Sequence, residues 1–195
     1  MSDQPQIIAL PPCVSVEPVS EISPADLSDL CDATEAAIES GGGFGWVHLP
    51  ARDLLENYWR GVVTMPARKL FIARLDGTVC GSAQLVHPPR NNEAQSFAAH
   101  LTGHFIAPWA RKYGLARMLV EEAEKYARDC GFAVVNLDVR ETMASAIKLY
   151  ESLGYQCCGT HPLYARVNDA VIPGRFYYKV IDPALTTPQK TESPI

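Results

Sequence analysis

The 195-residue chain has no long apolar run, no cluster of basic residues and no C-x-x-C pair of cysteines. No apolar stretch approaches the ~20 residues that a membrane-spanning helix needs, so we expect no membrane partner. No Lys/Arg run is interleaved with aromatic residues, and the formal net charge is -5. Both features argue against a nucleic-acid partner and favour a cationic amine as the bound substrate.

The six cysteines form no C-x-x-C pair, the usual spacing of redox and zinc sites. We therefore expect reduced cysteines, mostly in the core, and a cytoplasmic protein. The acidic N-terminus lacks the apolar segment of an export signal, which agrees with that location. No metal site is predicted, because the H-x-x-x-H spacing of His100 and His104 brings two ligands together on a helix but not on a strand.

The length favours a single domain. Residues 1–12 contain three prolines and no apolar period, which predicts a flexible arm. Residues 182–195 are rich in proline and threonine and are predicted to be a disordered tail. The folded domain would then occupy residues 13–181.

Capping and turn signals organise the first half of the chain. Ser23 is a favourable helix N-cap, and Pro24 suits the first helical position. Asp76-Gly77 is a dipeptide typical of tight hairpin turns. The expected elements are a strand at 13–19, a helix from 24 to the glycines at 41–43, a helix at 51–63, and a hairpin of strands 69–75 and 79–86.

The second half is predicted to alternate between strands and helices. The expected elements are a strand at 95–106, a helix at 114–130, a strand at 134–139, a helix at 144–153, and two strands at 155–160 and 175–180 that flank a loop at 161–174. A right-handed crossover should place strand 134–139 parallel to strand 95–106. Gly103 predicts a bulge in the earlier of these two strands.

The stretch Ile106 to Ala116, IAPWARKYGLA, joins a strand to an amphipathic helix. The first N–H groups of that helix have no partner within it, and the helix dipole adds positive potential there. The turn is therefore a candidate diphosphate site built largely from backbone. Gly114 permits close approach, Ala116 is small, and Arg111 and Lys112 supply charge.

The spacing Arg-x-x-Gly-x-Ala resembles the acetyl-CoA pyrophosphate motif of the GNAT acetyltransferase superfamily. The stretch Val139 to Tyr155, VRETMASAIKLYESLGY, resembles the second signature of that superfamily, with Met143 where asparagine is usual. Together the two signatures make the resemblance specific over residues 71–155. It implies the GNAT fold, of α+β or α/β class: a mixed, mostly antiparallel sheet of six to seven strands with about four helices, whose central strands are splayed around acetyl-CoA.

The resemblance also implies which residues contact acetyl-CoA as the co-substrate. They lie at the end of the strand, in the turn, in the first helical turn and in the second signature. The expected contacts are Phe105, Ile106, Arg111, Lys112, Tyr113, Gly114, Leu115, Ala116, Met143 and Tyr150.

Acetyl transfer to an amine needs an acid for the departing thiolate and a base for the amine proton. Tyr150 aligns with the tyrosine that is the general acid in many relatives, although it would also fill an apolar helix face. His100 stands where several relatives carry a carboxylate, and imidazole titrates in the useful range. Asp138 on the adjacent strand would orient that imidazole or hold the ammonium. The alternatives are a surface histidine and a structural carboxylate.

Aromatic residues in the run GGGFGW are candidate walls of the acceptor pocket. The resemblance places this loop beside the substrate, so Phe44 and Trp46 either line the pocket or anchor the loop to the core.

The C-terminal stretch HPLYARVNDAVIPGRFYYK resembles acetyltransferases of the tabtoxin- and phosphinothricin-resistance type, which act on small amino-acid-like amines. The resemblance makes Tyr164 and Arg166 candidate substrate contacts. Either Arg166 or Arg175 would clamp a substrate carboxylate with two hydrogen bonds.

These observations predict an acetyl-CoA-dependent N-acetyltransferase that transfers the acetyl group directly to a small primary amine, amino-acid-like or antibiotic-like. Two alternatives stay open. One is acetylation of a protein N-terminus or lysine, and the other is a non-catalytic acyl-CoA-binding regulator, which Met143 in place of asparagine keeps in consideration. The sequence leaves the oligomeric state open, with a homodimer among the options.

Overall fold

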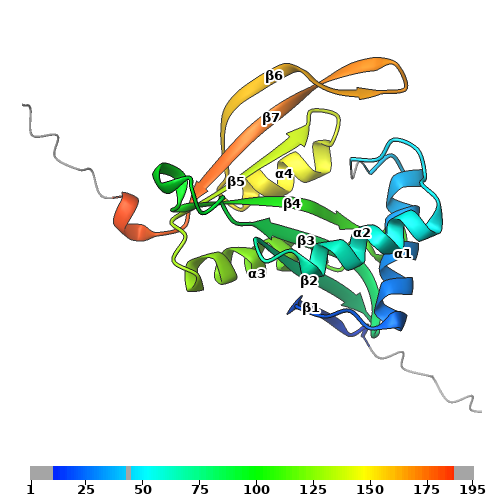
Figure 1. Cartoon of the computed structure of the whole chain (residues 1–195). Coiled ribbons are helices and arrows are strands. Elements are labelled where there is room, and N and C mark those ends of the chain that lie inside the picture. Colours follow the sequence, from blue (N-terminus) through cyan, green and yellow to red (C-terminus); the bar gives the residue numbers. More distant parts are fainter. Residues whose placement is uncertain (1–10, 43–44, 187–195) are drawn as a thin grey trace, which may run out of the picture.

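The computed structural model describes residues 11–42 and 45–186, and within them the chain forms one seven-stranded sheet with helices on both faces (Figure 1). The fold prediction is confirmed in strand number, in helix number and in the mixed sheet. The elements are β1 (Val14–Val19), α1 (Pro24–Glu39), α2 (Arg52–Thr64), β2 (Arg68–Leu75), β3 (Thr78–Val86), β4 (Ala98–Ile106), α3 (Leu115–Asp129), β5 (Val134–Arg140), α4 (Ala144–Ser152), β6 (Gln156–Val167) and β7 (Ala170–Val180), with short 3₁₀ turns at Glu93–Gln95, Pro108–Ala110 and Pro183–Thr186.

The strand order is β1-β2-β3-β4-β5-β7-β6, and the one parallel pair in it is β4 with β5. Their pairing covers only residues 98–100 against residues 134–136, although both strands run on beyond it. The two strands therefore diverge toward their C-terminal ends, as Figure 1 shows. The predicted splay of the central strands is confirmed.

A bulge in β4 adds to this divergence. Against β3, Ser82 faces Phe105 but Gln84 faces Thr102, so β4 carries one extra residue between them. Gly103 lies in this stretch with φ at 58°, and a Cβ there would come within 2.6 Å of Gln84 Nε2. Positive φ and close packing both require glycine, so the predicted bulge is confirmed with its physical cause.

Two apolar clusters hold the helices to opposite faces of the sheet. On one face α1 and α2 pack around the fully buried Trp59, together with Leu70 and Ile72 of β2. On the other face α3 and α4 pack against β2 to β5, and Tyr150 of α4 lies in this second cluster. The start of α1 is as predicted, because the Asp26 N–H donates to Ser23 Oγ at 3.1 Å.

The C-terminal region differs from the prediction, because no loop separates the last two strands. β6 and β7 form one long hairpin in which Val167 pairs with Ala170 across the two residues Asn168 and Asp169. Those two residues have φ of 48° and 64°, the geometry of a type I′ turn, which Asn and Asp tolerate better than other non-glycine residues. The predicted loop at 161–174 is therefore wrong.

Two prolines misled that prediction. Pro162 lies where the pairing of β6 with β7 slips between His161 and Ala165, and Pro173 lies opposite this slip. Both prolines therefore occupy irregular positions of the ladder, where the missing N–H is tolerated.

The cysteine prediction is partly wrong. All six cysteines are free, but only Cys31 and Cys80 are buried, while the other four are exposed. No helix in the described residues is long and apolar enough to cross a membrane. Most of the N-terminal arm and residues 187–195 of the tail lie outside the described residues, and the tail begins with the 3₁₀ turn at Pro183–Thr186.

Candidate active site

Two adjoining cavities lie where β4 and β5 diverge. The hairpin cavity, of about 570 Å³, is lined by Asp138, Tyr150, Tyr164 and further residues of β4, β5, α4 and β6. The turn cavity, of about 840 Å³, is lined by the end of β4, residues 110–112 and 114–117, and the start of α4. The residues that line both cavities are Gly42, His104, Met143 and Ala146.

The turn cavity ends at the N-terminus of α3. Gly114 is the N-cap of that helix with φ at 81°, and a Cβ there would meet no atom within 4 Å. The first turn of α3 holds no acidic residue, and Arg111 and Lys112 add positive charge beside it. Arg111 is held by hydrogen bonds from Nη2 to Ser40 Oγ at 3.1 Å and from Nε to the Ile106 carbonyl at 3.4 Å. An open helix N-terminus with two cations fits a diphosphate.

Most of the residues predicted to contact acetyl-CoA meet in this cavity. Tyr113 is half exposed and does not line it, and Tyr150 lines the hairpin cavity instead. The eight that do line it are Phe105, Ile106, Arg111, Lys112, Gly114, Leu115, Ala116 and Met143.

In the hairpin cavity, the Asp138 carboxylate is held from two sides. His100 Nε2 lies 2.9 Å from Oδ1, and the Tyr164 hydroxyl donates to Oδ2. The hydrogen bond with His100 is the largest cause that lowers the pKa of Asp138, and the Tyr164 hydroxyl lowers it further against the opposing effect of burial. Asp138 is therefore ionised at neutral pH, and it contacts the imidazole; it was predicted either to orient that ring or to hold the ammonium.

Tyr164 reaches Asp138 because of a glycine on the facing strand. A Cβ at Gly174 of β7 would lie 2.2 Å from the Tyr164 ring, so any larger residue there would displace the ring. Burial, followed by the contact with Asp138, raises the pKa of Tyr164, so this hydroxyl stays protonated and donates a hydrogen bond to the carboxylate.

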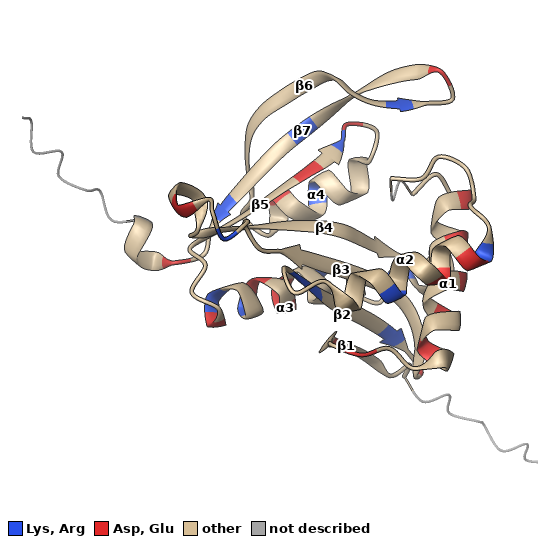
Figure 2. Cartoon of the chain, viewed as in Figure 1, with Lys and Arg blue, Asp and Glu red and all other residues tan. Residues whose placement is uncertain are grey.

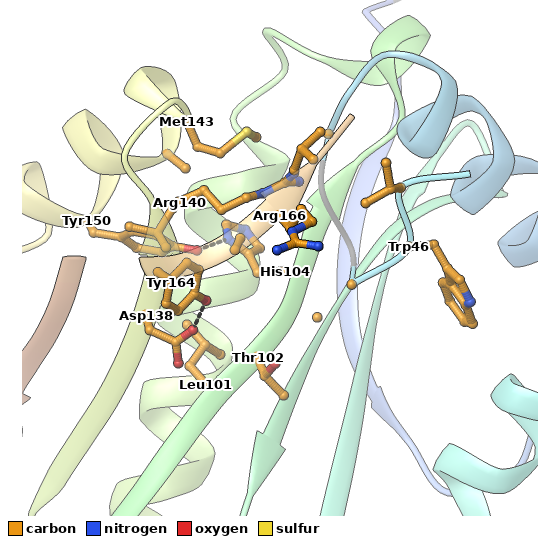
Figure 3. A pocket seen from close by; sticks show the side chains of 18 of the residues that line it. Trp46, Leu101, Thr102, His104, Asp138, Arg140, Met143, Tyr150, Tyr164 and Arg166 are labelled. Carbon is orange, nitrogen blue, oxygen red and sulfur yellow. Dashed lines mark hydrogen bonds between the residues drawn. The ribbon is translucent and has the colours of Figure 1, made fainter. Parts of the chain in front are cut away.

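Tyr150 and His104 form a second pair in the same cavity, as the dashed line in Figure 3 shows. His104 Nε2 lies 3.0 Å from the Ala116 carbonyl, which only accepts, so Nε2 carries the hydrogen. Burial lowers the pKa of His104 to about 4, which leaves the ring neutral at pH 7 and Nδ1 without a hydrogen. The Tyr150 hydroxyl, 2.8 Å from Nδ1, must therefore be the donor of this bond.

His104 was missed as a site residue by the sequence analysis. Its signal was a histidine on an apolar strand next to the bulge at Gly103, and we weighed it only as a metal ligand. His100 and His104 instead belong to two separate hydrogen-bonded pairs, one with Asp138 and one with Tyr150.

The comparison with known families agrees with this geometry. The family described as Acetyltransferase (GNAT) family matches residues 32–155. The chain belongs to the GNAT acetyltransferase family. This membership confirms the predicted superfamily and the predicted enzyme class, an acyltransferase.

Individual GNAT relatives extend the comparison. A protein of Azospirillum brasilense, named an uncharacterized N-acetyltransferase in the hisH-hisA intergenic region, is 58% identical over 129 residues, which are 66% of this chain and 77% of that protein. Aminoglycoside N(6')-acetyltransferase type 1 of Klebsiella aerogenes is 29% identical over 102 residues, 52% of this chain and 67% of that protein.

Among solved structures, the Salmonella typhimurium protein yncA, with its cofactor acetyl-CoA, is similar to this chain with a TM-score of 0.71. The sequences are 16% identical, and the match covers 87% of this chain and 95% of that one. At this identity the likeness shows the GNAT fold. The predicted co-substrate, acetyl-CoA, agrees with the family.

The acceptor residues predicted for this GNAT protein gather in the hairpin cavity, where Trp46, Tyr164 and Arg166 all contribute to the lining. Trp46 also packs edge to face on Tyr58 at 5.0 Å, so it both borders the cavity and anchors the loop. Phe44 lies outside the described residues. Arg175 instead forms an ion pair with Glu141, with Nη2 to Oε1 at 2.6 Å, which corrects its proposed role as a clamp.

Met143 is where this chain departs from the second GNAT signature. It is the N-cap of α4 and provides no side-chain hydrogen bond to the helix, whereas asparagine is among the best capping residues. The side chain lines both cavities, so the substitution exchanges a capping amide for an apolar contact at their junction.

Proposed function

We propose that this GNAT enzyme transfers the acetyl group of acetyl-CoA directly to a primary amine of a small molecule. The observation that carries the proposal is the junction of the two cavities. His104, Met143 and Ala146 line both, so a thioester entering from the turn cavity and an amine held in the hairpin cavity meet there.

The donor side uses mainly backbone. The N-terminus of α3, with Gly114 as its cap, would hold the diphosphate, and Arg111 and Lys112 would neutralise its charge. The diverging strands β4 and β5 leave backbone groups between them for the extended arm of acetyl-CoA. When bound, acetyl-CoA supplies an electrophilic thioester carbonyl.

The acceptor side uses side chains. The amine nitrogen bonds to the thioester carbonyl carbon, and the carbon–sulfur bond breaks. His100, whose side chain is 41% exposed, takes the amine proton through water and passes it to solvent, while Asp138 fixes its ring. The Tyr150 hydroxyl turns from His104 Nδ1 to protonate the departing thiolate, and the phenolate takes a proton back from solvent because burial raises the pKa of Tyr150.

The two alternatives fit less well. A non-catalytic regulator has no need for a His100–Asp138 pair at the edge of the hairpin cavity or for a buried tyrosine in the wall of that cavity. The β6 strand contributes Tyr164 and Arg166 to the cavity wall, which narrows the approach for a protein chain. The Klebsiella aerogenes relative is named for a small-molecule acceptor, which supports a small molecule over a protein as the acceptor here.

The test is an amine screen with two readouts, release of free CoA thiol and the mass of the acetylated product. The panel should contain small primary amines and, separately, peptides with a free N-terminus or an internal lysine. We expect thiol release that depends on a small amine. Acetyl-CoA binding by calorimetry without any amine-dependent release would favour the regulator, and turnover of peptides alone would favour protein acetylation.

A further inference from the structure

Two arginines enter the hairpin cavity without a carboxylate partner. Arg140 ends β5 and Arg166 lies on β6, and both guanidinium groups point into the cavity in Figure 3. Within residues 11–42 and 45–186, neither belongs to a salt bridge, whereas Arg52 and Arg74 each contact two or more carboxylates. Arg140 Nη2 is buried and has no hydrogen-bond partner there.

The two arginines approach the hairpin cavity from strands on either side of β7, which pairs Arg140 with Gly174 and Arg166 with Val171. β5 and β6 are both antiparallel to β7, so they run in the same direction. Arg140 follows Asp138 by two residues, and Arg166 follows Tyr164 by two. Residues two apart share a face of a strand and are separated by roughly 6.6 Å. Beyond the hydrogen bond between Tyr164 and Asp138, the next step on each strand is therefore an arginine.

Two guanidinium groups in one cavity are unfavourable unless an anion binds beside them. Two like charges in one cavity repel each other, and a buried N–H without a partner loses the hydrogen bonds that it makes with water in the unfolded chain. A planar guanidinium donates parallel hydrogen bonds to carboxylate, phosphinate or phosphonate oxygens. The chain as a whole is acidic, with a net charge of -5 and acidic residues spread along α1 (Figure 2). The two arginines in the hairpin cavity therefore stand out against the overall charge of the protein.

We infer that Arg140 and Arg166 form an anion subsite for the acceptor. The acceptor is then a small primary amine that carries a carboxylate, phosphinate or phosphonate within about 7 Å of its nitrogen, one step along the strand. This inference rests on the proposed acetyl transfer to an amine. The acidic net charge favours cationic acceptors in general, but a polycationic acceptor would place its second positive charge beside two guanidinium groups. The anion subsite therefore disfavours polycations.

The experiment compares acceptors in matched pairs. Each pair is an anionic amine and the same compound with its anion masked as an amide or methyl ester, drawn from L-amino acids, phosphinothricin and 2-aminoethylphosphonate, with spermidine and kanamycin as polycations. We expect wild-type kcat/KM to favour the anionic member at least tenfold. In Arg166→Gln this preference should fall about 10- to 100-fold, because the anionic member loses a charged donor that the masked member does not use.

Arg60→Gln is the matched control, because Arg60 is an exposed arginine of α2 whose partner is Glu56. It should keep the wild-type preference. If the masked amines or the polycations are the better acceptors and Arg166→Gln leaves the preference unchanged, the anion subsite is wrong while the proposed function stands.

A binding measurement keeps the inference testable without turnover. Methylphosphonate, titrated by calorimetry into the protein with CoA bound, should bind at least tenfold more weakly to Arg166→Gln than to wild type. Arg140→Lys keeps the charge but loses the second parallel donor, and should give a smaller loss. Equal affinity for wild type, Arg166→Gln and Arg60→Gln would overturn the subsite, whatever the amine screen shows.

Discussion

The turn cavity and the hairpin cavity are built in different ways. The turn cavity takes most of its lining from two contiguous stretches, residues 104–117 and 142–149, and its central feature is the backbone at the start of α3. The hairpin cavity takes its lining from residues 42, 45–47 and 58 and from the stretches 101–104, 138–150 and 164–167. A backbone site depends on local spacing and tolerates changes of side chain, whereas a side-chain site depends on long-range pairing and on single residues.

The largest effect is expected in the hairpin cavity, at Tyr150. Tyr150→Phe removes the proton donor and should lower kcat about 10²- to 10⁴-fold, with acetyl-CoA affinity nearly unchanged. It also leaves His104 Nδ1 without its donor, so a fall of about 1–3 kcal/mol in unfolding free energy should accompany it. Steady-state kinetics and urea unfolding measure the two effects.

The matched control for this variant is Tyr155→Phe. Tyr155 is buried, its ring centroid lies 5.8 Å from that of Tyr150, and it lines neither cavity. Near-normal turnover in Tyr150→Phe, or an equal loss in Tyr155→Phe, would reduce Tyr150 to a packing residue.

A second prediction concerns the base. kcat/KM should rise as pH rises toward neutrality, because only a neutral imidazole accepts the amine proton. His100→Gln should abolish this rise and lower kcat/KM about 10²-fold or more. The pKa of Asp138 lies below its ordinary value, so Asp138 stays ionised near neutral pH. Its titration therefore adds nothing to the rise of kcat/KM with pH.

The variant Asp138→Asn separates orientation from proton transfer. It should reduce the rate less than His100→Gln does and should keep a pH-dependent rise. A wild-type profile in His100→Gln would exclude His100 as the base.

CoA binding in the turn cavity should depend on the charge of the residue at position 114. Gly114→Asp and Gly114→Asn place similar side chains at φ of 81°, a conformation that both residues tolerate, and open space surrounds the new Cβ. The carboxylate should weaken CoA binding about 10- to 100-fold relative to the amide, because it faces a diphosphate. Calorimetry on the two variants tests this, and equal affinities would remove the diphosphate from the start of α3.

The smallest expected effect is at Gly174, where the hairpin positions Tyr164. Gly174→Ala should push the Tyr164 ring off Asp138 and raise the KM for the acceptor about tenfold, with CoA affinity unchanged. Gly159→Ala is the control on the same hairpin, because its Cβ would meet no atom within 4 Å. If both variants behave alike, the contact between Tyr164 and Gly174 does not shape the acceptor site.

The difference between the cavities also explains what the sequence could predict. The cap at Ser23, the bulge at Gly103 and the turn at Gly114 depend on local backbone preferences, and all three were predicted. The pairing of His100 with Asp138 followed from placing both on adjacent strands, and their contact at 2.9 Å agrees.

The hairpin was not predictable in the same way. Its turn, Asn168-Asp169, lacks the glycine that usually marks a type I′ turn, and its prolines are tolerated only because the ladder slips opposite them. The bond between Tyr150 and His104 joins residues 46 apart through the packing of α4 against β4, which no local pattern encodes.

The divergence of β4 from β5 creates an edge in the interior of the sheet. Outer edges are commonly protected from further pairing by charged residues or proline, but an interior edge that must accept a ligand has to keep its donors and acceptors unblocked. Amide hydrogen exchange should therefore be fastest in this sheet along the open portions of β4 and β5, and it should slow when the extended arm of the acyl donor occupies the place of the missing strand.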